Sequence, residues 1–141
     1  MRHLLREASL AERVEVDSAG TAGYHAGDVP DARARSAGRR VGIEVAGRAR
    51  QFQRVDFERF DYVLAMDRSN FEDLCELAPD PAARAKVHLL RSFDSASPVG
   101  ASVPDPYYGG DEDFDEVVQI CLAACKPLLE RLRREHSLDT P

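Results

Sequence analysis

The clearest potential for chemistry in this sequence lies in one stretch, Pro104-Asp105-Pro106-Tyr107-Tyr108-Gly109-Gly110. Two prolines restrict the backbone around one carboxylate, and two adjacent tyrosines follow it. A rigidly held acid beside aromatic side chains suits proton donation to an aromatic leaving group. A simple Pro-Asp-Pro turn whose tyrosines cover a sheet edge fits the same spacing equally well, and both interpretations stay open.

Two further polar side chains, Ser18 and Asp67, stand where predicted strands end. Ser18 belongs to a run of turn formers at 17–21, and Asp67 follows an apolar run at 62–66. Ligands of open α/β sheets bind outside the carboxyl ends of the strands, so both residues are candidates for a site. Each also has an ordinary structural interpretation, Ser18 as a turn former and Asp67 as the N-cap of the next helix.

The cysteines require a separate test, because a cysteine followed six positions later by an arginine can capture and transfer a phosphoryl group. Cys125 and Arg131 have this spacing. We reject the pair, because phosphate capture needs backbone N–H groups that converge in a loop, and residues 125–131 are predicted to lie inside a helix. Cys75, Cys121 and Cys125 all lie on apolar helical stripes and are interpreted as small buried hydrophobes.

Charged residues cluster in two regions. Acidic residues at 111–116 suit the N-terminus of the last helix through its macrodipole. Eight arginines between 31 and 60 favour a solvated helix face over a dedicated anion site. The four histidines are scattered without metal-ligand spacing. The arginines are Arg33, Arg35, Arg39, Arg40, Arg48, Arg50, Arg54 and Arg59.

Length, composition and charge limit the class of protein. The chain has 141 residues, of which 43% are hydrophobic, and one compact domain over residues 1–141 is expected. The net charge of -6 disfavours nucleic acid as a partner. Apolar runs such as 62–66 are far short of the ~20 residues that span a bilayer. Three cysteines, an odd number, favour a reducing compartment, and we expect the cytoplasm.

Helical and strand patterns alternate along the chain. Strands are predicted at Val14–Val16, at 62–66 and at 86–90, and helices over 1–10, over 30–41, over 71–78 after a capping box at 69–72, and over 114–132. Pro127 is expected to interrupt the last helix. This alternation predicts an α/β fold with a parallel sheet and right-handed crossovers, although the sheet is one strand short for four helices.

Four motifs follow one another along the chain. They are Val16-Asp17-Ser18-Ala19-Gly20-Thr21, Arg50-Gln51, the segment 60–70 with its Met-Asp-x-Ser-Asn motif, and Asp105-Pro106-Tyr107-Tyr108-Gly109. On these motifs the sequence resembles the low-molecular-weight protein tyrosine phosphatases from Arg2 to about 133. The resemblance implies a three-layer α/β/α fold with four strands in a short parallel sheet. It also implies hydrolysis of phosphotyrosine through a phosphocysteine intermediate, without a metal or organic cofactor.

The same resemblance assigns roles to individual residues. Asp105 is implied to be the general acid that protonates the tyrosine leaving oxygen and then the base that activates water. Tyr107 and Tyr108 are implied to form one wall of the substrate cleft, with Tyr24 opposite them. Ser18 and Asp67 are implied to support the phosphate-binding loop.

This sequence departs from the family in two places. The family's Cys-x5-Arg loop, which holds the nucleophile, is missing ahead of the helix that here begins at Met1. The resemblance therefore implies a domain truncated at its N-terminus by roughly two dozen residues, the size of a strand, a loop and the start of a helix. Ala46-Gly47 stand where members usually carry Ser-His, so a buried histidine of the support network is lost.

Two other functions stay open. The missing nucleophile and Gly47 favour a non-catalytic remnant or an interaction module, and we expect the 141-residue chain alone to be inactive. A thiol-dependent arsenate reductase is the weaker alternative, because Cys75 has no neighbouring resolving cysteine. The expected partners are phosphotyrosine-containing proteins or small aryl phosphates. We expect a monomer that binds neither nucleic acid nor membranes.

Overall fold

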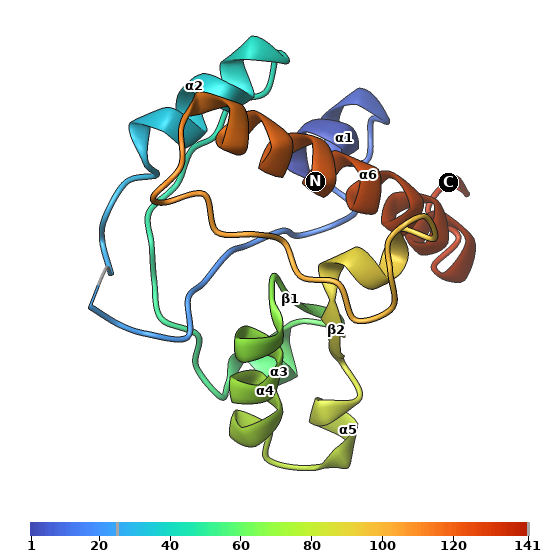
Figure 1. Ribbon diagram of the computed structural model, residues 1–141. Coiled ribbons are helices and arrows are strands. Elements are labelled where there is room, and N and C mark those ends of the chain that lie inside the picture. The colour runs from blue at the N-terminus through green and yellow to red at the C-terminus, as the bar shows by residue number, and fades with distance from the viewer. Residues whose placement is uncertain (25, 141) are drawn as a thin grey trace.

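The computed structural model describes residues 1–24 and 26–140 and has a short parallel sheet between layers of helices (Figure 1). Strand β1 (Val63–Ala65) pairs with strand β2 (Val87–Leu89), and Val63 lies opposite Val87. The helices are α1 (Arg2–Glu7), α2 (Ala32–Arg40), α3 (Asp56–Arg59), α4 (Arg68–Leu77), α5 (Pro81–Arg84) and α6 (Asp111–Glu135), with a 3-10 helix at Leu90–Phe93.

The sheet separates two apolar clusters, and this separation produces three layers. Val63 and Ala65 belong to a cluster with residues of α3, α4 and α5, whereas Leu64 packs against a larger cluster formed mainly by α1 and α6. In Figure 1, α6 and α1 lie on one side of the sheet and α3, α4 and α5 on the other. The predicted α/β class and a β1 strand covered on both faces are confirmed.

The last helix, α6, has the apolar stripe predicted from the sequence but differs from the prediction at one position. Its buried residues, Phe114 to Leu132, follow the predicted apolar stripe. The helix begins at Asp111, as the acidic run at 111–116 predicts, and there the Asp113 carboxylate accepts the Gly110 N–H (2.9 Å). The expected interruption at Pro127 is wrong, because the helix continues through it to Glu135.

Aspartates cap α2 and α4, which confirms the N-cap interpretation of Asp67 and not the predicted capping box. Asp67 caps α4 by accepting the Asn70 N–H (2.7 Å), so the helix starts before the Ser69–Glu72 box expected from the sequence. Asp31 caps α2 by accepting the Arg33 N–H (2.8 Å). A carboxylate suits both places, because the first N–H groups of a helix lack partners inside it.

The predicted strand at Val14–Val16 is wrong. This segment has no ladder partner among the described residues, and the nearest pairing is a single parallel bridge between Gly20 and Gln51. Alternation of side chains cannot make a strand when no neighbour accepts its backbone hydrogen bonds. The sheet therefore has two described strands, fewer than the three predicted from the pattern.

Membrane-spanning helices are not found in the described part of the chain. None of the helices in residues 1–24 and 26–140 combines the length and the apolar character that crossing a bilayer requires.

Candidate active site

The loop from Pro104 to Gly110, called the acid loop below, folds back on itself around the side chain of Asp105. Asp105 Oδ1 accepts the N–H of Tyr107 (3.0 Å), and the Pro106 carbonyl accepts the N–H of Gly109 (2.8 Å). The rings of Tyr107 and Tyr108 meet edge to face with centroids 4.9 Å apart. Asp105 and both rings are exposed, so one short loop presents a carboxylate and two aromatic rings to solvent.

The acid loop begins at the carboxyl end of β1. The N–H of Val103 donates to the carbonyl of Met66 (2.7 Å), and Val103 itself is buried. Asp67 follows Met66 directly, and its side chain caps α4. The structure thus brings the acid loop and the Asp67 turn together through a backbone contact that sequence patterns do not reveal.

Arg33 of α2 reaches across to the other end of the acid loop. Its guanidinium donates to the carbonyl oxygens of Tyr107 (2.9 Å) and Gly109 (3.1 Å) and lies 4.5 Å from the ring centroid of Phe114. Asp31 accepts from the same guanidinium, and this hydrogen bond lowers the pKa of Asp31. The sequence pattern does not single out Arg33, whose one local signal is the Asp-x-Arg spacing after Pro30.

Ser18 lies in a second loop, which Arg50 holds in place. Arg50 donates to Asp17 (3.1 Å) and, through two nitrogens, to the buried carboxylate of Asp56 (2.9 and 3.2 Å). The Ser18 N–H lowers the pKa of Asp17, and the Arg50 hydrogen bond lowers that of Asp56. Ser18 is exposed, and within the described residues no hydrogen bond involves its Oγ.

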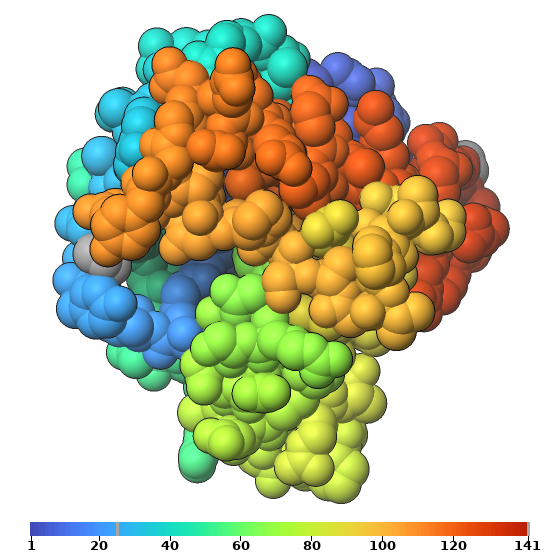
Figure 2. Space-filling view, in the orientation of Figure 1, coloured from blue at the N-terminus to red at the C-terminus, as the bar shows by residue number. Residues whose placement is uncertain are grey.

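Tyr24 is placed on the surface of the same second loop, 82% exposed. Figure 2 shows a hollow on one face of the molecule, bordered by the acid loop in orange, the segment before α2 in blue and α4 in green.

The arginine-rich segment does not form the single solvated helix face that the sequence predicts, although most of its arginines are exposed. Only four of the eight arginines belong to α2, and several of the eight tie distant segments together instead of facing solvent alone. A sequence pattern cannot show such contacts, because their partners lie far away along the chain. Besides Arg33 and Arg50, Arg40 bonds Asp115 (2.8 Å), Arg48 bonds the Gly27 carbonyl (3.0 Å) and Arg59 bonds Glu15.

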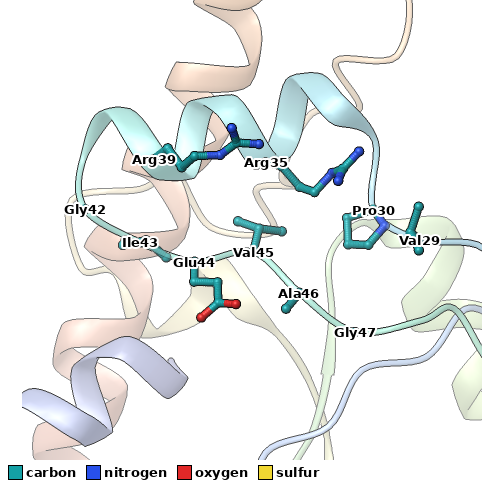
Figure 3. A pocket seen from close by; sticks show the side chains of 10 residues that line it. All are labelled: Val29, Pro30, Arg35, Arg39, Gly42, Ile43, Glu44, Val45, Ala46 and Gly47. Atoms are coloured by element: carbon teal, nitrogen blue, oxygen red, sulfur yellow. The ribbon is translucent and has the colours of Figure 1, made fainter.

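A cavity of about 540 Å³ lies between α2 and the segment 42–47 (Figure 3). Arg35 and Arg39 extend from α2 along it, and the buried Nε of Arg35 has no hydrogen-bond partner within the described residues. Gly47 lies at its edge with φ 109°, a backbone conformation that other L-residues rarely adopt. The local backbone therefore suits glycine, and not a histidine, at this position.

The cysteines confirm the rejection of a phosphate loop at Cys125. Cys125 is buried inside α6, Cys121 is half-buried one turn before it, and Cys75 is half-buried in α4. Burial raises the pKa of the Cys121 thiol, which disfavours the nucleophilic thiolate. Among the described residues, no three His, Cys, Asp or Glu side chains converge as metal ligands would.

Comparison with known proteins gives one consistent result. A family model described as "Low molecular weight phosphotyrosine protein phosphatase" matches residues 1–138. The protein of that name from Homo sapiens is 40% identical over 131 residues, which make up 92% of this chain and 82% of the relative. A "Low molecular weight protein-tyrosine-phosphatase" from Streptomyces coelicolor is 42% identical over 95% of this chain and 82% of its own length.

The fold matches solved structures of the same kind. A crystal structure of a protein tyrosine phosphatase from Entamoeba histolytica, with Hepes in its active site, superimposes with a TM-score of 0.90 at 33% identity. The alignment covers 96% of this chain and 85% of that one. Family model, sequence identity and fold agree, and the chain belongs to the low molecular weight phosphotyrosine protein phosphatase family.

Proposed function

We propose that this protein hydrolyses phosphotyrosine through a phosphocysteine intermediate, with Asp105 as general acid and then general base. The observation that carries the proposal is the hydrogen bond from the Val103 N–H to the Met66 carbonyl (2.7 Å), because it holds the acid loop at the carboxyl end of β1. Ligands of parallel α/β sheets bind at that end of the strands. Membership of the phosphatase family supports the same reaction.

The reaction has two steps. A thiolate attacks phosphorus, the bond between phosphorus and the tyrosine oxygen breaks, and Asp105 gives its proton to that oxygen. The Asp105 carboxylate then takes a proton from water, whose oxygen attacks the phosphocysteine and releases inorganic phosphate and the thiolate. Asp105 Oδ1 accepts the Tyr107 N–H, so Oδ2 is the oxygen that carries the transferred proton.

The neighbouring residues bind substrate and support the site in this proposal. Tyr107 and Tyr108 are 59% and 97% exposed, and these accessible rings form the wall against which the phosphotyrosine ring packs, with Tyr24 opposite. Ser18 donates a hydrogen bond to the phosphate-binding loop. Asp67 fixes the turn after β1 through its cap of α4.

The nucleophile and the phosphate-binding arginine come, in this proposal, from a strand and a Cys-x5-Arg loop encoded directly upstream of Met1. Two observations support this origin. All three cysteines of the chain lie within helices, whose amides are bonded along the helix. Strand β1 pairs only with β2 among the described residues, which leaves its other edge open to a further parallel strand.

The coding DNA tests this origin first. We expect the reading frame to continue upstream of Met1 through an apolar strand, a cysteine, five residues and an arginine. The translated product is called the extended protein below. An in-frame stop codon within this distance would remove the proposed source of the nucleophile and favour the non-catalytic remnant.

Hydrolysis of a phosphotyrosine peptide by the two forms then tests the function itself. The extended protein should turn over, and the 141-residue chain should not, because it lacks the thiolate and the amides that stabilise the transferring phosphoryl group. Turnover by the 141-residue chain that disappears with Cys125→Ser would show that the helical cysteine is the nucleophile. An inactive extended protein would contradict the proposed function.

The same proposal specifies the substrates, the oligomeric state and the cellular compartment. The substrates are phosphotyrosine-containing proteins or small aryl phosphates, bound by a monomer. Cys75, Cys121 and Cys125 are free thiols, which supports a reducing compartment such as the cytoplasm. Gel filtration of the extended protein at assay concentration measures the oligomeric state.

A further inference from the structure

We propose that Arg33 is a positioning residue for the general acid, and that it acts on Asp105 through the backbone of Tyr107. This inference rests on the function proposed above, in which Asp105 transfers the proton. It assigns a task to a residue that lies 72 positions away in the sequence, on a different element.

The contacts form a continuous chain from α2 to the acid. Arg33 donates to the Tyr107 carbonyl (2.9 Å), and the Tyr107 N–H donates to Asp105 Oδ1 (3.0 Å). A second nitrogen of Arg33 donates to the Gly109 carbonyl (3.1 Å), so two points of the loop are fixed by one rigid group. A planar guanidinium suits this task, because its donors keep a fixed spacing.

The Arg33 side chain is itself held on three sides. Asp31 accepts from Nε (3.2 Å) and from a terminal nitrogen (3.0 Å), and the hydrogen bond raises the pKa of Arg33. The Phe114 ring, whose centroid is 4.5 Å from the guanidinium carbon, and the Tyr107 ring at 5.8 Å bracket the group. We call the Arg33 guanidinium, with its hydrogen bonds to the Tyr107 and Gly109 carbonyls, the clamp. Asp31 is fixed as the N-cap of α2, so the clamp is anchored to a helix and not to another loop.

The acid loop needs such an anchor, because its own contacts are few. Asp105, Tyr107 and Tyr108 are all exposed, and their backbone lies between the Val103 contact at one end and the start of α6 at the other. Proton transfer requires the acid within hydrogen-bond distance of the leaving oxygen, and small displacements are costly. Loss of Arg33 should therefore affect the proton-transfer step more than phosphate binding.

Steady-state kinetics of the extended protein test the proposal. Arg33→Gln should lower kcat for phosphotyrosine by roughly 10- to 100-fold, with a smaller loss for a nitrophenyl phosphate, whose leaving group needs less protonation. Inhibition by inorganic phosphate should stay nearly unchanged. Arg33→Lys keeps the charge but not the fork of donors, so it should not restore the rate.

A matched control and a double variant separate positioning from general damage. Arg40→Gln removes the same charge from the same helix and also breaks a contact to α6, the Asp115 pair, but it does not touch the acid loop. It should leave kcat unchanged. In an Asp105→Asn background, Arg33→Gln should add little further loss, because residues that act through one another are not additive.

Hydrogen exchange tests the clamp without relying on activity. In the 141-residue chain, Arg33→Gln should speed exchange of the Tyr107 and Gly109 amides several-fold relative to Arg40→Gln, with α6 amides as the internal reference. Unchanged exchange would overturn the clamp. Faster exchange combined with full additivity on Asp105→Asn would overturn the link to the acid, and faster exchange in a protein without phosphatase activity would overturn the proposed function and leave the clamp intact.

Discussion

Gly109 and Gly110 are neighbours at the end of the acid loop, yet a side chain would meet very different surroundings at each. A Cβ at Gly109 would lie 2.3 Å from Oδ2 of Asp113, the same carboxylate that accepts the Gly110 N–H. A Cβ at Gly110 would meet nothing within 4 Å. The first glycine is therefore required by close approach and the second is not.

Gly109→Ala should displace either the loop or the Asp113 cap of α6 and lower the free energy of unfolding by about 1–3 kcal/mol, the range for a lost cap combined with local strain. Gly110→Ala is the matched control and should cost about 1 kcal/mol or less, as expected for an N-cap glycine. Urea denaturation of the two variants measures the difference. Equal losses would show that the Asp113 contact does not constrain Gly109.

At the scale of elements, strand β2 contains His88, whose ring lies next to two aromatic rings. The centroid of His88 lies 6.1 Å from that of Tyr62 and 5.6 Å from that of Phe93. Burial, and then the charge of Arg131, lower the pKa of His88 below its ordinary value. The folded state thus favours neutral His88, whereas the unfolded chain takes up a proton near the ordinary histidine pKa, about 6.5.

The sign of the pH effect follows directly. His88 binds more protons in the unfolded state, so the free energy of unfolding should fall as the pH decreases from 7 to 5. His88→Gln should flatten this dependence. Urea unfolding at several pH values provides the measurement, and a slope that survives His88→Gln would assign the effect to other groups.

Elements also show which parts of the fold could be predicted. The last helix was predictable because its apolar stripe recurs over many turns, and Asp67 as a helix cap because its partner is local. The helices α3 and α5 span one turn each, too short for a period to show. Val14–Val16 has the alternation of a strand but no neighbouring ladder, which depends on segments far away in the sequence.

Some residues of the candidate site could likewise be predicted from the sequence, and others could not. The acid loop was recognisable because proline, aspartate and tyrosine stand together in the sequence. Arg33 and Arg50 were missed as individual contacts, because their partners lie on other segments and arginine is also common on solvated helix faces. Long-range hydrogen bonds of this kind leave no periodic signal.

At the scale of the whole molecule, two layers of helices pack on a sheet of only two described strands. Both edges of such a sheet leave backbone groups without ladder partners, and two strands alone give little stability. We expect the 141-residue chain to melt at low temperature or over a broad range, and the extended protein to melt higher. Calorimetry of both forms tests this, and a cooperative melt of the 141-residue chain at high temperature would contradict it.

The central claim, that Asp105 donates the proton to the leaving oxygen, is tested most directly by Asp105→Asn in the extended protein. Asparagine keeps the shape of the side chain but cannot transfer the proton, so phosphotyrosine hydrolysis should slow by roughly 10²–10⁴-fold. The loss should be smaller for a nitrophenyl phosphate, and phosphate analogues should still bind. A variant that keeps its rate on poor leaving groups but loses affinity for phosphate analogues would make Asp105 a binding residue and contradict the account.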